Sequence, residues 1–267
     1  MSYQVAIIEI TERCPLNCLG CYISKNPKDM KFSEFKEIIN KLPKSIKRLE
    51  LSGGETFLHP KLLDFCKYAT NELIKPQIFT SGFLPEKDKI KELKPYINSI
   101  KVTIRSANPE RDSFLRGKLN SFEKSVRTLE ICKELGIPRY IHFVVDKESI
   151  KEMEDMEKLA KKYDAKLIKL PFLPHLNTPE IIERFDSEIL ANEYPLDLCP
   201  AGVLRFSVNV YGDVTPCVYI RENFGNLLKE SFAEIKARMY NWRAEWGKCK
   251  NKCIAKEILM KKIKIPA

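Results

Sequence analysis

Short apolar segments alternate with amphipathic segments along the first 173 or so residues of this 267-residue chain. Each apolar segment is short enough for a strand, and the stretch after it has apolar positions at helical spacing. The predicted strands are 5–11, 48–52, 77–80, 100–104, 140–145 and 166–170. This alternation favours a parallel sheet covered by helices. Six such units predict an α/β fold, a partial (β/α)6 barrel of the TIM type rather than a closed barrel of eight.

The predicted helices are bounded by capping residues, prolines and glycines. Ser33 is expected to cap the first helix, and Pro85 is expected to begin the third. Gly136 is expected to end a long helix as its C-terminal cap. The remaining core helices are expected over 60–73, 121–135 and 148–162.

The alternation stops after Pro171, where a different pattern begins. A bridging helix over 179–190 is expected, and then two strands joined by a turn at Tyr211-Gly212-Asp213. These hairpin strands are predicted over 205–210 and 214–219, and a final helix over 232–246. We therefore expect a barrel domain over 1–178 and a small cysteine-rich auxiliary domain over 179–267.

Composition narrows the class of protein. The hydrophobic fraction of 44% suits a globular core, and no apolar run is long enough for a membrane span. The first ten residues are too short and too uncharged for a signal peptide. The cysteines are odd in number and clustered, which favours the reducing cytoplasm over a disulfide scaffold. The net charge is +10, but lysines alternate with glutamates, as in 151–162, so a solvated surface is favoured over a nucleic-acid partner.

Cys14, Cys18 and Cys21 form a C-x3-C-x2-C run directly after the first predicted strand. In parallel α/β folds the carboxyl ends of the strands carry the active site. Three thiolates can hold three corners of a four-iron four-sulfur cluster and leave one iron open. Zinc, the alternative, usually takes four ligands, and no histidine is near this loop in sequence.

The cysteine run, Tyr22 and Gly53-Gly54-Glu55 after the second strand together resemble the radical S-adenosylmethionine (radical SAM) enzymes. Further segments follow the family's order, namely Thr80-Ser81-Gly82, Val102-Thr103-Ile104 and Arg116-Gly117. The resemblance covers most of residues 5–173. It implies a cluster on the three cysteines whose open iron binds S-adenosylmethionine. It also implies a 5′-deoxyadenosyl radical that abstracts a substrate hydrogen atom, with electrons from a donor such as ferredoxin or flavodoxin.

The resemblance also assigns cofactor contacts. Gly53, Gly54 and the Glu55 side chain are expected near the methionine amino group, and Arg116 near its carboxylate. Thr103 and Ser81 are expected at the cofactor, and Tyr22 against the adenine. Some of these contacts have a plainer alternative: a strand–helix turn for the glycines, a surface position for Arg116 and a loop anchor for Tyr22. Where relatives often carry an aspartate after strand four, this chain has Arg105, which favours an anionic substrate group or a further cofactor contact.

Four more cysteines lie towards the other end of the chain: Cys199, Cys217, Cys249 and Cys253. Cys199, Gly212 and Cys217 resemble the opening of the SPASM domain, a module that binds auxiliary clusters. With two cysteines after them, the segment resembles the shortened twitch form. The resemblance implies one fully ligated four-iron four-sulfur cluster, which either accepts an electron or only orders the domain. A zinc site and a disulfide pair are the alternatives.

Other candidates are expected to be structural. Cys66 and Cys132 are expected in the core, His59 at a helix start, and Trp242 and Trp246 against the auxiliary domain. His142 and Lys169 either face the barrel interior or are simply buried. Two other classes of protein are the alternatives to a radical SAM enzyme. One is an iron–sulfur electron carrier, and the other is a nucleic-acid-binding protein stabilised by zinc. We expect no peptide-recognition domain before the first strand, which favours a small-molecule substrate or a peptide delivered by a separate partner.

Overall fold

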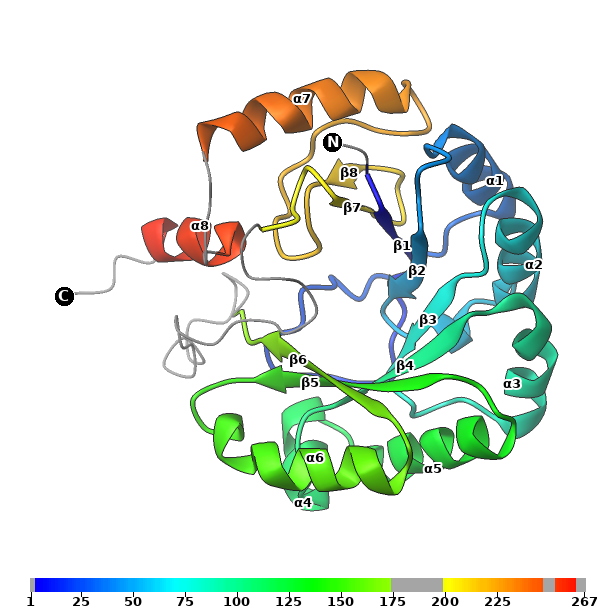
Figure 1. Cartoon of the computed structure of the whole chain (residues 1–267), viewed down its shortest axis with the longest axis vertical. Helices are drawn as coiled ribbons and strands as arrows, with labels where there is room; N and C mark the ends of the chain where they lie inside the picture. The colour runs from blue at the N-terminus through cyan, green and yellow to red at the C-terminus, as the bar shows by residue number, and fades with distance from the viewer. Residues whose placement is uncertain (1–2, 174–198, 247–252, 263–267) are drawn as a thin grey trace.

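The computed structural model describes residues 3–173, 199–246 and 253–262. Within these residues an eight-stranded sheet runs in the order β6-β5-β4-β3-β2-β1-β7-β8, with helices around its outside (Figure 1). All neighbours pair in parallel except β7 and β8. The strands are β1 Val5–Thr11, β2 Arg48–Gly53, β3 Gln77–Thr80, β4 Ser99–Ile104, β5 Arg139–Val145, β6 Lys166–Pro171, β7 Arg205–Val208 and β8 Val214–Thr215. The predicted α/β fold with a partial barrel and a C-terminal hairpin is confirmed.

Eight α-helices are described: α1 Phe32–Lys41, α2 Leu62–Glu72, α3 Lys87–Leu93, α4 Pro109–Arg116, α5 Ser121–Glu134, α6 Met153–Lys162, α7 Phe232–Glu245 and α8 Ile254–Lys262. Three short 3-10 helices accompany them: η1 Thr56–Leu58, η2 Lys94–Tyr96 and η3 Ser149–Glu152. The main core lies between the sheet and the outer helices. Ile8 and Ile10 of β1 pack there with Phe35 and Ile38 of α1.

Several predicted boundaries were wrong for local reasons. Ser33 does not cap the first helix: the N-cap is Lys31, whose backbone N–H donates to the Glu34 carboxylate at 2.7 Å, so the helix starts earlier. Pro85 lies before α3, which begins at Lys87. Gly136 does follow α5 with a φ of 64°, as predicted.

Two predicted helices do not begin as α-helices at the expected residue. The second strand of the hairpin is also shorter than predicted. Residues 60–73 contain α2, which begins at Leu62. Residues 148–162 begin with η3, because Asp146 Oδ1 accepts the backbone N–H groups of Glu148 and Ser149 and starts a tight turn. β8 has two residues, so Cys217 lies beyond it. The predicted helix over 179–190 lies outside the described residues.

One long-range pairing was not predicted. β7 runs parallel to β1, with Val5 opposite Arg205 and Ile8 opposite Val208. The first hairpin strand therefore extends the barrel sheet, and β7 and β8 lie beside β1 in Figure 1. Because β8 is antiparallel to β7, with Thr215 opposite Ser207, the chain runs from β8 to Cys217 towards the start of β7, whereas Cys14 follows the end of β1.

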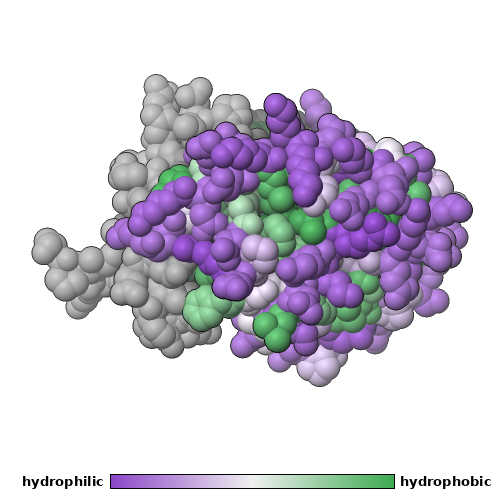
Figure 2. Space-filling model, turned by 90° about the horizontal axis from the view of Figure 1, so that it is seen from below, coloured by the Kyte–Doolittle hydropathy of each residue, from purple (hydrophilic) through white to green (hydrophobic). Residues whose placement is uncertain are grey.

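The face of the molecule that Figure 2 shows is mainly polar where its residues are described. Figure 2 shows the face seen from below Figure 1, where hydrophilic residues surround small, separate hydrophobic patches. In the described ranges, no helix combines the length and apolar character that crossing a membrane requires.

Candidate functional site

The loop after β1 brings Cys14, Cys18 and Cys21 to the carboxyl end of the sheet, where all three are free thiols. They line one cavity of about 220 Å³ between the strands and the loops. Tyr22 of the same loop lines this cavity, and so do predicted site residues from four other segments: Gly53, Gly54, Ser81, Thr103 and Arg116. The cavity therefore collects motifs that are more than 90 residues apart in sequence.

The C-terminal end of α4 holds the cysteine loop. The backbone N–H of Asn17 donates to the Arg116 carbonyl at 3.0 Å, and that of Leu19 to the Leu115 carbonyl at 2.9 Å. Gly117 has a φ of 60°, and an added Cβ would stand 2.6 Å from the Asn17 carbonyl oxygen. The Arg116-Gly117 pair therefore sets the position of the loop between Cys14 and Cys21.

The two glycines after β2 lie directly against the segment that leads into Cys14. A Cβ on Gly53 would stand 2.2 Å from the Thr11 carbonyl oxygen, and one on Gly54 would stand 2.3 Å from the Arg13 carbonyl oxygen. The Gly54 N–H donates to the Thr11 carbonyl at 2.7 Å. Any side chain at these positions would push the cysteine loop away, and φ at Gly53 is 134°, which also favours glycine.

Glu55 is buried, and its carboxylate connects this loop to the end of β3. One oxygen accepts the Thr80 hydroxyl at 2.8 Å, and the other accepts the Ser81 N–H at 2.8 Å and the Ser81 hydroxyl. Glu55 is not among the residues that line the cavity. The structure therefore places its carboxylate behind Ser81, where it orients that side chain.

Arg116 is 1% exposed and makes a network beneath the same loop. Its guanidinium donates to Asp112 at 3.3 Å, to the Ser125 hydroxyl at 2.7 Å and to the Ser81 carbonyl at 2.5 Å. Most of its donors are thus used within the protein. Arg105 is another arginine that lines the cavity, and it donates to the Leu19 carbonyl at 3.1 Å.

Tyr22 connects the first cysteine loop to the C-terminal part of the chain. Its ring packs edge-on against Tyr219, with centroids 5.9 Å apart. The guanidinium of Arg221 lies 5.6 Å from the same ring and forms an ion pair with Glu9 of β1. Burial raises the pKa of the Tyr22 hydroxyl, and the nearby Glu9 carboxylate adds to this, so the phenol stays neutral.

Two of the three cysteines lie in surroundings that disfavour the charged thiolate. Burial raises the pKa of Cys14 to about 12 and also raises that of Cys21. Iron binds the thiolate, so assembly must release protons here. Within the described ranges, no three His, Cys, Asp or Glu side chains are close enough to hold a single metal ion.

Three cysteines of the second group also lie together. Cys199 and Cys253 share a hydrogen bond, which lowers the pKa of Cys199 to about 6 and raises that of Cys253. Cys217 is buried, and burial raises its pKa. Backbone bonds tie the segments together, because the Gly202 N–H donates to the Pro216 carbonyl at 3.1 Å. Cys249 lies outside the described residues.

The structure places the remaining candidates and adds new ones. His142 both lines the cavity and is buried, with its ring edge-on to Phe79 at 4.7 Å. Cys66 and Cys132 are buried in the main core, as expected. Sequence reasoning missed Glu50, which lines the cavity and pairs with buried Lys101 at 2.8 Å. A charged residue inside a predicted strand was the signal that could have identified this pair.

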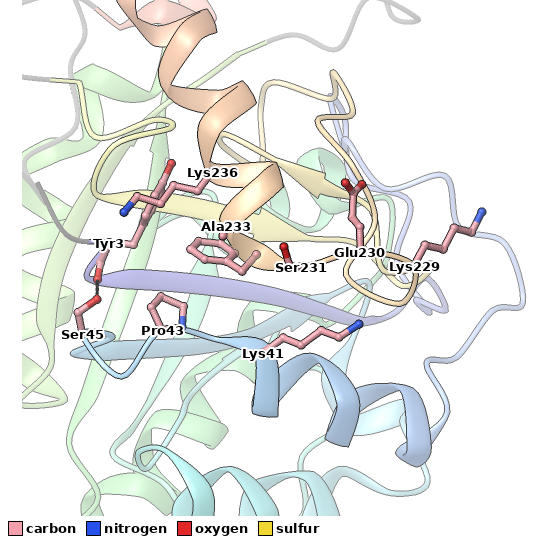
Figure 3. A pocket seen from close by; sticks show the side chains of 10 residues that line it. Tyr3, Lys41, Pro43, Ser45, Lys229, Glu230, Ser231, Ala233 and Lys236 are labelled. Carbon is pink, nitrogen blue, oxygen red and sulfur yellow. Dashed lines mark hydrogen bonds between the residues drawn. The ribbon is translucent and has the colours of Figure 1, made fainter.

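A second pocket opens on the surface near the start of α7, away from the cysteines (Figure 3). Lys41, Lys229 and Lys236 line it together with Tyr3 and Ser45. Lys41 donates to the Leu227 carbonyl at 2.5 Å and pairs with Glu37 at 2.8 Å. This pocket contains none of the predicted site residues.

Comparisons with known proteins agree with the geometry. Residues 8–160 match the family model of the radical SAM superfamily, and residues 199–254 match that of an iron–sulfur cluster-binding domain, SPASM. The antilisterial bacteriocin subtilosin biosynthesis protein AlbA of Bacillus subtilis (strain 168) is 24% identical over 262 residues, covering 86% of this chain and 58% of AlbA. The chain thus spans less than two thirds of that relative.

Solved structures share the fold. SuiB of Streptococcus suis, bound to the precursor peptide SuiA, superposes with a TM-score of 0.73 and 15% identity, covering 88% of this chain and 65% of SuiB. Native anSMEcpe with bound AdoMet and the Cp18Cys peptide gives a TM-score of 0.72 and 16% identity, covering 94% of this chain and 89% of the other. With the family match over more than half of its length, the chain belongs to the radical SAM superfamily and carries a C-terminal SPASM domain.

Proposed function

We propose that the chain is an enzyme that reductively cleaves S-adenosylmethionine and uses the resulting radical to oxidise or cross-link a peptide. One observation carries this proposal: three free cysteines and Gly53-Gly54 line a single cavity at the carboxyl end of the sheet. An iron–sulfur electron carrier would need no such cavity beside its cluster. A nucleic-acid-binding protein stabilised by zinc would need metal ligands grouped around a single ion.

Cys14, Cys18 and Cys21 would hold the first four-iron four-sulfur cluster. When bound, this cluster with S-adenosylmethionine supplies a 5′-deoxyadenosyl radical, as is usual in the family. The backbone of Gly53 and Gly54 is free of side chains on the cavity wall and would accept close approach of the cofactor.

Four more residues line the same cavity and would complete the cofactor site: Ser81, Thr103, Arg105 and Tyr22. Arg116 and Glu55 would act mainly as positioning residues, because both hold Ser81. Arg105 lines the cavity and would be a candidate partner for a carboxylate of the cofactor or of the substrate. A direct Arg116 contact to the methionine carboxylate is the alternative.

Cys199, Cys217, Cys249 and Cys253 would hold one auxiliary cluster with all four irons ligated. The gathering of the three described cysteines supports this, together with the SPASM match over 199–254. A cluster with no open iron is suited to electron transfer or to ordering the segment, rather than to binding S-adenosylmethionine.

A peptide is the favoured substrate because relatives of similar fold are described with peptides, such as SuiB with its precursor SuiA. A small molecule is the second candidate, because the cavity of about 220 Å³ is small. An electron donor such as ferredoxin or flavodoxin would reduce the first cluster, and a reducing cytoplasm would suit its free thiols.

Anaerobic reconstitution tests the proposal. The chain is loaded with iron and sulfide, reduced with dithionite and given S-adenosylmethionine, and 5′-deoxyadenosine is measured by chromatography. Incubation with total peptide from the source cell, followed by mass spectrometry for a loss of about two hydrogens, would then separate peptide from small-molecule substrates. Absence of 5′-deoxyadenosine from cluster-loaded protein would refute the enzymatic proposal.

A further inference from the structure

The two most exposed large hydrophobic side chains of the described residues lie on one turn at the end of α4. Phe114 is 69% exposed and Leu119 is 81% exposed. Backbone hydrogen bonds close the turn, from the Gly117 N–H to the Phe114 carbonyl at 3.1 Å and from the Lys118 N–H to the Ser113 carbonyl at 3.0 Å. The turn therefore holds both apolar side chains at the surface, where contact with water is unfavourable.

This turn lies directly behind the first cysteine loop. The backbone N–H groups of Asn17 and Leu19 donate to carbonyls of the last turn of α4, at 3.0 and 2.9 Å. Cys18, between these two residues, lines the cavity. An electron that enters at Phe114 or Leu119 would therefore cross only the end of α4 and the cysteine loop to reach the first cluster.

The chain around this turn is basic. Residues 13–28 and 113–122 together contain five lysines and arginines and not one aspartate or glutamate. Lys25 donates to the Asn17 side chain at 2.8 Å, and Asn17 packs against the turn, in which Lys118 is exposed. A partner that fits this surface must carry carboxylates around an apolar contact.

The pocket in Figure 3 is another surface lined by lysines, but it lies at the opposite end of the sheet. Tyr3 and Ser45, which line it, precede β1 and β2, whereas the cysteine loop follows β1. The two surfaces are separated by the length of β1, roughly 20 Å. The pocket therefore offers a control surface of the same charge that is remote from the first cluster.

We propose that Phe114, Lys118 and Leu119, with Lys25 beside them, form the docking surface for an acidic, flavin-carrying electron-transfer protein that reduces the first cluster. This inference rests on the proposed function, because the three cysteines must hold a cluster that takes up an electron. In this step the anionic, fully reduced flavin loses one electron and the oxidised cluster gains it. No proton moves and no bond forms or breaks.

The apolar side chains favour a flavin over an iron–sulfur carrier. The ring system of a flavin has an apolar edge, which Phe114 and Leu119 would contact while carboxylates of the carrier face the lysines. An iron–sulfur carrier presents an anionic, thiolate-ligated cluster, which has no apolar edge of this kind. Electron-transfer partners form small, transient interfaces of under about 1,200 Å², so a docking surface of this extent is sufficient.

The test compares two reductants on the full, reconstituted chain, with 5′-deoxyadenosine as the measured product. Dithionite is small and needs no docking surface, whereas flavodoxin, kept reduced by NADPH and its reductase, must dock. In Leu119→Glu and in Lys118→Glu we expect the rate at limiting flavodoxin to fall by about tenfold, because the new carboxylate would face an acidic carrier. The rate with dithionite should stay within about twofold of wild type, since both side chains are exposed.

Lys229→Glu is the matched control, because it makes the same change of charge in the pocket of Figure 3. Flavodoxin-driven rates of Leu119→Glu and Lys118→Glu that equal the rate of this control would overturn the inference. Equal losses with both reductants would also overturn it, and so would a wild type that flavodoxin cannot reduce, whether or not ferredoxin can. Wild-type protein that forms no 5′-deoxyadenosine even with dithionite would refute the proposed function itself, which is a distinguishable result.

Discussion

Arg221 and Glu9 form a two-pronged ion pair, at 2.6 and 3.1 Å, between the C-terminal part of the chain and β1. Glu9 is fully buried, and Arg221 also lies against Tyr22 beside Cys21. The pair therefore connects the SPASM segment to the first cysteine loop. Removing one partner leaves the other without its counter-charge in a buried place.

We expect Arg221→Met to lower the free energy of unfolding by about 3 kcal/mol, which is typical when one member of a buried pair is removed. The double variant Arg221→Met, Glu9→Leu should recover part of this loss. Thermal unfolding of the reconstituted chain gives the measurement. Equal midpoints for wild type and Arg221→Met would show that the pair does not hold the two parts together.

Gly54→Ala tests the packing behind the first cysteine loop. Its Cβ would stand 2.3 Å from the Arg13 carbonyl oxygen, so the loop that carries Cys14 must move. We expect the iron content to fall by about half, with the auxiliary cluster retained, and no binding of S-adenosylmethionine by calorimetry.

Gly136→Ala is the control for Gly54→Ala. Gly136 has a positive φ, of 64°, which Gly54 does not have, but an added Cβ at Gly136 has nothing within 4 Å. The Gly136→Ala variant should lose roughly 1 kcal/mol in its free energy of unfolding and keep both clusters. If both variants lose iron alike, the effect of Gly54→Ala does not come from its contact with the cysteine loop.

Arg116→Met separates a supporting role from direct cofactor binding. Arg116 pairs with Asp112, and both side chains are buried, so its loss should lower stability by about 3 kcal/mol. Arg127→Met removes an exposed arginine from α5 and should cost under about 1 kcal/mol. An unchanged melting midpoint with lost S-adenosylmethionine binding would instead favour a direct contact from Arg116.

His59 predicts a pH dependence of stability. Its Nδ1 accepts the Lys61 N–H at 3.1 Å and its Nε2 donates to the Met30 carbonyl at 3.0 Å, an arrangement that needs the neutral ring. Burial lowers the folded pKa of His59. The unfolded chain therefore takes up a proton first, near pH 6.5, and stability is lost as the pH falls from there towards the folded pKa.

In His59→Gln this loss should be smaller. Melting midpoints of both proteins between about pH 7.5 and pH 5 give the comparison, since other acid-sensitive groups act on both alike. Parallel curves for the two proteins would contradict the assignment of a neutral, buried His59.

The sequence predicted the site best where a cysteine or glycine motif directly follows a predicted strand. Cys14, Cys18 and Cys21 after β1 and Gly53-Gly54 after β2 could be placed at one end of a parallel sheet, because parallel strands share that end. The strands themselves were also predicted well, since their apolar runs are short and are bounded by turns. The contact between Gly54 and the Arg13 carbonyl could not be predicted from the sequence, because a backbone carbonyl is the same for every residue type.

Contacts between distant segments were not predictable. The pairing of β7 with β1 depends on Val5 meeting Arg205, which are 200 residues apart. Tyr22 meets Tyr219 through packing between the same distant parts of the chain, whereas Glu55 meets Ser81 where the ends of β2 and β3 lie side by side. Ser33 is a residue type that often caps helices, but the N-cap is Lys31, two residues earlier, whose backbone N–H donates to the Glu34 carboxylate.

The most direct measurement of the central claim combines an iron count with product analysis on wild-type protein and on the variant Cys14→Ala, Cys18→Ala, Cys21→Ala. Wild type should bind about eight irons per chain and form 5′-deoxyadenosine from S-adenosylmethionine and dithionite, and the variant should keep about four irons and form none. Wild-type protein that holds its clusters but yields no 5′-deoxyadenosine would contradict the account.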